Sequence, residues 1–130
     1  MLENSNNQLQ TANMFSYKWH QVHSYRDSGL RNLWGNWLKE KYLTGNQQLL
    51  EEIFDSDKVR MLDAGCGAGI SSLLLFGDYL RKADYVGVDI SNSIELAKIE
   101  FKRLDLQATF IQSDLFQLVF KYFEDICCAK

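Results

Sequence analysis

The sequence MLDAGCGAG, residues 61–69, is the clearest indication of how this chain folds. It begins as an apolar strand that ends in an acid, Asp63, and passes through three glycines at alternate positions into an apolar, helix-like run over 70–76. Glycines at a strand-to-helix turn let backbone N–H groups approach a ligand closely, because no Cβ stands in the way. The pattern therefore predicts a binding site for a small ligand that carries a nucleoside.

The spacing of the glycines separates the possible cofactors. A dinucleotide site is typically G-x-G-x-x-G, but here the third glycine is Gly69 and position 70 is Ile. A phosphate-binding P-loop requires Gly-Lys-Ser or Gly-Lys-Thr, and the sequence contains neither. Asp63 would repel a pyrophosphate and suits a ligand with a positive charge. An NAD-dependent oxidoreductase is thus a minor alternative.

Two further apolar runs end in acids, and they extend the pattern. YVGVD, residues 85–89, places Asp89 about 20 residues beyond Gly69, the distance at which an acid reaches ribose hydroxyls in nucleotide-binding units. FIQSD, residues 110–114, ends in Asp114. With the glycine motif and both acids in this order, the chain resembles the class I S-adenosylmethionine (SAM)-dependent methyltransferases.

The resemblance implies a SAM site along these three segments. It implies that Asp63 favours the ammonium of SAM, that Asp89 accepts hydrogen bonds from the ribose hydroxyls, and that Asp114 accepts one from the adenine amino group. It also implies that Ile90 offers an apolar surface to adenine and that the Leu115 N–H reaches a ring nitrogen. The implied cofactor-binding residues are Asp63, Gly65, Cys66, Gly67, Gly69, Asp89, Ile90, Asp114, Leu115, Tyr17 and Trp19.

An aromatic segment near the N-terminus contains Tyr17 and Trp19. It resembles an N-terminal segment of some small-molecule methyltransferases, which folds over the cofactor in those enzymes. An aromatic face attracts a sulfonium by cation–π interaction. The alternative is that these rings only anchor an N-terminal helix.

Other reactive side chains have structural interpretations. Cys127 and Cys128 stand where cytosine-C5 methyltransferases carry Pro-Cys, but the proline is absent, so buried strand cysteines are the better interpretation. His20 and His23 do not form a standard zinc spacing with these cysteines, so no metal site is expected. No catalytic base is identified.

Strand-like and helix-like segments alternate along the chain, which predicts an α/β fold with a Rossmann-like parallel sheet flanked by helices. Strands are expected at 59–63, 85–89, 108–112 and 123–128, and helices at 69–80 and 92–104. Apolar residues at three- and four-residue steps predict an N-terminal helical extension over 29–43. The expected organisation is a flexible polar tail over 1–13, an aromatic and helical cap over 14–56, and a SAM-binding half-domain over 57–130. The sheet is expected to be truncated after about the fourth strand.

Composition narrows the setting. The 130 residues are enough for one modest domain. The net charge is −3, so the composition lacks the excess of basic residues that is typical of nucleic-acid-binding proteins. No apolar run approaches a membrane span. Three cysteines, two of them adjacent, do not resemble a disulfide framework and favour a reducing cytoplasm.

The function expected from the resemblance is methyl transfer from SAM to an unidentified, small-molecule acceptor. The alternative is a SAM-binding module or fragment that is catalytically incomplete and needs a partner chain. An open sheet edge invites pairing, so a homodimer or a partner chain covering that edge is expected in this case.

Overall fold

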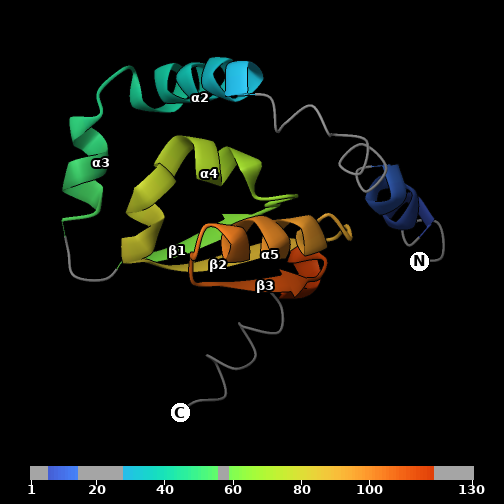
Figure 1. Ribbon diagram of the computed structural model, residues 1–130. Coiled ribbons are helices and arrows are strands. Elements are labelled where there is room, and N and C mark those ends of the chain that lie inside the picture. The colour runs from blue at the N-terminus through green and yellow to red at the C-terminus, as the bar shows by residue number, and fades with distance from the viewer. Residues whose placement is uncertain (1–5, 15–27, 56–58, 119–130) are drawn as a thin grey trace, which may run out of the picture.

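The computed structural model describes residues 6–14, 28–55 and 59–118 (Figure 1). Residues 6–14 form a first helix, and residues 115–118 form a final helical turn. Between them the elements are α2 (Ser28–Leu43), α3 (Gln48–Ile53), β1 (Val59–Ala64), α4 (Ile70–Phe76), the 3-10 helix η2 (Gly77–Lys82), β2 (Ala83–Asp89), α5 (Ile94–Arg103) and β3 (Ala108–Gln112).

The three strands form one parallel sheet in the order β1-β2-β3. Tyr85 of β2 pairs with Met61 of β1 on one side and with Ala108 of β3 on the other. Because the strands are parallel, their carboxyl ends meet at a single edge of the sheet. The predicted α/β, Rossmann-like arrangement is confirmed, and the three expected strands lie within two residues of their predicted bounds.

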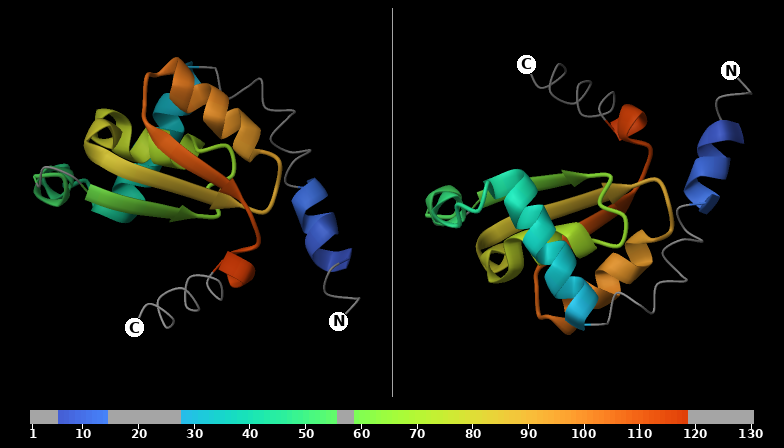
Figure 2. Two further views of the ribbon diagram at one scale, coloured as in Figure 1. Left: turned by 90° about the horizontal axis from the view of Figure 1, so that it is seen from below. Right: turned by 90° about the horizontal axis from the view of Figure 1, so that it is seen from above.

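The described core lies between the sheet and the helices on one of its faces (Figure 1). Tyr85 and Phe110 project from the strands onto Phe101 of α5, with ring centroids 4.8 and 5.1 Å from that of Phe101. Helix α2 crosses over α4, as the view from above shows (Figure 2), and buries Leu38. The core cluster comprises Leu43, Leu50, Phe54, Leu73, Leu80, Ala83, Tyr85, Phe101 and Leu106.

The opposite face of the sheet is open in the described part of the chain. Leu62 of β1 is 66 % exposed, and Arg60, Asp84 and Thr109 on the same face are exposed as well. Among the described strands β1 pairs with β2 alone, so its other edge is free there.

Two expected segments differ from the structure. The helix predicted over 69–80 ends at Phe76, because Gly77 adopts φ 51° and ψ −128°, which no α-helix accommodates. Residues 6–14, within the expected polar tail and its boundary, form a helix that buries Ala12. The predicted strand over 123–128, with Cys127 and Cys128, lies outside the described residues, as do Tyr17, Trp19, His20 and His23.

Candidate functional site

The glycine loop connects β1 to α4 at the carboxyl edge of the sheet. Gly65, Gly67 and Gly69 all have positive φ angles, of 82°, 54° and 74°. L-residues with side chains rarely adopt this conformation, so the three glycines are what allow the turn. The N–H groups of Gly65 and Cys66 both donate to the carbonyl of Val88, at 2.7 and 3.0 Å, and this fastens the loop to β2.

The glycines at the two ends of the loop face different surroundings. A Cβ added to Gly69 would stand 2.9 Å from a ring carbon of Phe101 and 3.3 Å from the Ala97 Cβ, so this glycine lets α5 pack against the loop. A Cβ added to Gly65 would meet no atom within 4 Å. The loop therefore presents open space at Gly65, where a ligand can approach the backbone.

The three predicted acids are brought to the same edge of the sheet. Asp63 is the penultimate residue of β1, Asp89 is the last residue of β2, and Asp114 follows β3 by two residues. Since neighbouring strands lie about 4.8 Å apart, the acids follow one another across the edge in strand order. All three are half-buried.

Asp63 is held by two hydroxyl groups. Its Oδ2 accepts hydrogen bonds from Ser72 Oγ of α4 and from Tyr85 Oη of β2, both at 2.5 Å. No sequence pattern indicated these two donors, because they depend on the strand register and on how α4 lies over β1.

Asp89 connects the loop to the start of α5. Its Oδ2 accepts from the Gly67 N–H at 2.8 Å, and its Oδ1 accepts from the N–H and the hydroxyl of Ser91 at 2.8 and 2.6 Å. The Ser91 hydroxyl is also hydrogen-bonded to that of Ser93, and both serines are buried. Ile90, next to Asp89, is half-buried, and its carbonyl accepts from Gln112 Nε2 at 3.2 Å.

Asp114 caps the final helical turn and contacts the N-terminal helix. Its Oδ1 accepts from the Phe116 N–H at 2.9 Å, across Leu115, the first residue of the turn. Its Oδ2 accepts from Gln8 Nε2 at 2.8 Å. The helix over 6–14 lies beyond the carboxyl ends of the strands in both views of Figure 2. Sequence reasoning gave no indication of Gln8.

Cys66 is a buried thiol within the loop. Burial, followed by the charges of Asp63 and Asp89, raises its pKa to about 12. The thiol therefore stays protonated near neutral pH and behaves as a small buried side chain. Its Sγ also lies 3.0 Å from where a Cβ on Gly87 would stand, so the absence of a side chain at Gly87 makes room for it.

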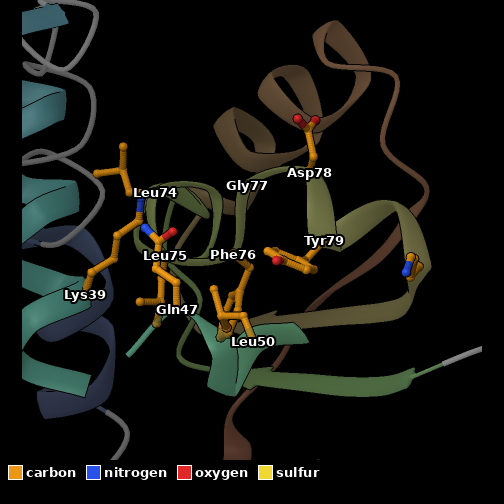
Figure 3. Close-up of a pocket in the computed structure, with 10 residues that line it drawn as sticks. Lys39, Gln47, Leu50, Leu74, Leu75, Phe76, Gly77, Asp78 and Tyr79 are labelled. Carbon is orange, nitrogen blue, oxygen red and sulfur yellow. The ribbon is translucent and has the colours of Figure 1, made fainter. Parts of the chain in front are cut away.

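A separate hollow of about 420 Å³ lies between α2, α3, the end of α4 and η2 (Figure 3). Its walls include Lys39, Leu50, Phe76 and Tyr79, and it reaches Lys82, just before β2 begins. The glycine loop and the three acids are at the other end of the strands, so this hollow takes no part in the site.

The described residues hold no metal cluster and no membrane-spanning helix. They contain no group of three or more His, Cys, Asp or Glu that could hold a metal ion. None of their helices has the length and apolarity that crossing a membrane requires.

One protein family matches the chain over a range that includes the whole described sheet. A family model described as a methyltransferase domain matches residues 55–128. No curated protein matches the sequence.

Several solved structures are similar to parts of the chain. The plantazolicin methyltransferase BpumL in complex with SAH is 23 % identical, with 88 % of this chain and 44 % of that one covered and a TM-score of 0.42. A protein from the conversion of a disulfide bond into a thioacetal group during echinomycin biosynthesis is 28 % identical over 53 % of this chain and 29 % of its own, with a TM-score of 0.39. A SAM-dependent methyltransferase from Aquifex aeolicus is 23 % identical over 52 % and 37 %, with a TM-score of 0.37. The chain spans less than half of each of these structures.

Proposed function

Because the chain belongs to the methyltransferase domain family, we propose that it binds S-adenosylmethionine at the glycine loop and takes part in methyl transfer to a small-molecule acceptor. The observation that carries the proposal is the row of Asp63, Asp89 and Asp114 along the carboxyl edge, beside a loop that is open at Gly65. An amino acid, a ribose and an adenine follow one another in SAM, and the three acids follow one another across the sheet.

Each acid suits one part of this ligand by its chemistry. An ionised carboxylate only accepts hydrogen bonds, as the ammonium, the ribose hydroxyls and the adenine amino group all require. In the proposed complex Asp63 lies toward the ammonium, Asp89 toward the ribose and Asp114 toward the adenine. Ile90 contributes apolar surface and Leu115 an N–H at the adenine. Tyr17 and Trp19, outside the described residues, stay predictions.

Bound SAM supplies an electrophilic methyl group. The part proposed for this chain is to hold that group in line with the acceptor, a contribution that can account for a large share of rate enhancement. No residue is assigned as a base, since one is needed only for an acceptor that is protonated at working pH.

The second candidate function is a cofactor-binding module that needs a partner chain to turn over. The exposed Leu62 and the free edge of β1 within the described sheet favour it, because open apolar edges invite pairing. Light scattering combined with a methyl-transfer assay separates the two. Turnover by a monomer would contradict the second candidate, whereas binding without turnover by a self-associating chain would support it.

We also propose a reducing, cytoplasmic setting, supported by Cys66 being a free buried thiol.

Calorimetric titration with S-adenosylhomocysteine (SAH) tests the proposed cofactor. We expect micromolar binding by the wild type and at least tenfold weaker binding by Asp89→Asn. Asp84→Asn is the matched control, because Asp84 is an exposed aspartate on the same strand. Absence of binding by the folded wild type would refute the proposal, and equal losses in both variants would remove Asp89 from the site.

A further inference from the structure

Tyr85 reaches from the hydrophobic core to the first acid of the site. Its side chain is 1 % exposed, and its ring packs against Phe101 and Phe110, with centroids 4.8 and 5.8 Å away. This packing leaves the ring little freedom to turn. The hydroxyl therefore points at Asp63 Oδ2 from a fixed direction, at 2.5 Å.

Ser72 approaches the same oxygen from a different element. It lies in the first turn of α4, is buried, and donates to Asp63 Oδ2 at 2.5 Å. The carboxylate is thus fixed by one donor from the strand beside it and one from the helix above it. No described residue donates to Asp63 Oδ1.

The two hydroxyls keep their protons in the working pH range. Burial, followed by the hydrogen bond to Asp63, raises the pKa of Tyr85 above its ordinary value. Hydrogen bonds to a charged partner are stronger than neutral ones, so the pair can hold the carboxylate in a single orientation.

We propose that Tyr85, assisted by Ser72, is a positioning residue that directs Asp63 Oδ1 toward the ammonium of the cofactor. This inference rests on the proposed function, because it assigns Asp63 to the amino-acid part of SAH and SAM. Tyr85 does not touch the ligand. Among the described residues both donors bind Oδ2, which leaves Oδ1 as the oxygen available there to an ammonium beside the open loop surface at Gly65.

The test measures coupling between the Tyr85 hydroxyl and the ligand ammonium. The wild type, Tyr85→Phe and Ser72→Ala are titrated with SAH and with S-(5′-adenosyl)-4-thiobutyrate, the same molecule without its amino group. We expect Tyr85→Phe to raise the Kd for SAH by about tenfold and the Kd for the deaminated analogue by less than twofold. Like Tyr85→Phe, Ser72→Ala should raise the Kd for SAH more than the Kd for the deaminated analogue.

Tyr79→Phe is the matched control, because Tyr79 is half-buried against Phe54 in the hollow at the other end of the strands. It should leave both Kd values unchanged. Circular dichroism checks that each variant is folded. If Tyr85→Phe is unfolded, the titrations of Ser72→Ala alone decide the inference.

A merely structural role for Tyr85 predicts equal weakening of both ligands, and that result would overturn the inference while the proposed cofactor stands. Unchanged SAH binding in Tyr85→Phe would overturn it as well. Failure of the folded wild type to bind SAH would instead refute the proposed function, and the inference with it.

Discussion

Asp89 Oδ2 accepts a hydrogen bond from the Gly67 N–H at 2.8 Å, which ties the end of β2 to the middle of the glycine loop. Gly67 and Ser91, the two residues whose donors Asp89 satisfies, are both buried. Asp89 thus has a structural role in addition to the one proposed for the ribose.

We predict that Asp89→Asn lowers the free energy of unfolding by about 1–3 kcal/mol, because it weakens hydrogen bonds to buried donors. Urea unfolding measures this loss, and Asp84→Asn should stay within about 0.5 kcal/mol of the wild type as an exposed substitution. A variant as stable as the wild type would mean that the loop does not depend on Asp89.

Gly65→Ala and Gly69→Ala should separate ligand binding from stability. At Gly69 an added methyl group meets Phe101 at 2.9 Å and the φ angle is positive, so we expect a loss of about 2–4 kcal/mol in the free energy of unfolding. At Gly65 the φ angle is also positive but the space is open, so the loss should be about 1 kcal/mol.

At Gly65 the substitution should weaken SAH binding strongly, although its effect on the free energy of unfolding is small. A methyl group there fills the space proposed for the ligand, and we expect at least tenfold weaker binding by a folded Gly65→Ala protein. Urea unfolding and calorimetry on both variants give the two quantities. Full SAH affinity in Gly65→Ala would place the ligand elsewhere.

The strands and the buried face of α5 could be predicted because their signals are local. Apolar runs that end in acids indicate β1, β2 and β3. The three- and four-residue spacing of Ile94, Ala97, Phe101 and Leu104 indicates the inner face of α5, and the structure buries the first three of them. The early end of α4 could also have been predicted, since Gly77 directly follows its apolar run.

The hydrogen bonds of the site could not be predicted in the same way. Tyr85 reaches Asp63 only because of the register of β1 against β2, and Gln8 meets Asp114 across a separation of 106 residues. Each bond depends on the assembled fold, and no local periodicity encodes it.

Because of Cys66, the free energy of unfolding should depend on pH in the alkaline range. Its pKa is raised from 9.0 to about 12 in the folded protein, so the folded state holds the thiol proton more tightly than the unfolded state does. This contribution to stability is complete below pH 9 and is lost as the pH rises toward 12, with a limiting slope of about 1.4 kcal/mol per pH unit.

Urea unfolding of the wild type and of Cys66→Ala between pH 7 and pH 11 measures this contribution. Cys127, Cys128 and the tyrosines are present in both proteins, so their titration cancels in the comparison. The advantage of the wild type over Cys66→Ala should shrink above pH 9. A difference that stays constant with pH would show that the thiol is not buried as described.

The final prediction concerns Gln8, whose amide donates to Oδ2 of Asp114, the residue proposed to accept from the adenine amino group. An amide and an adenine amino group are both N–H donors, so they compete for the Asp114 carboxylate. We expect Gln8→Ala to tighten SAH binding by up to about threefold, since only one exposed hydrogen bond must be replaced. Gln10→Ala, an exposed glutamine on the same helix, should leave the affinity unchanged. Weaker SAH binding by Gln8→Ala would instead mean that the helix over 6–14 helps to hold the cofactor, and the competition would be ruled out.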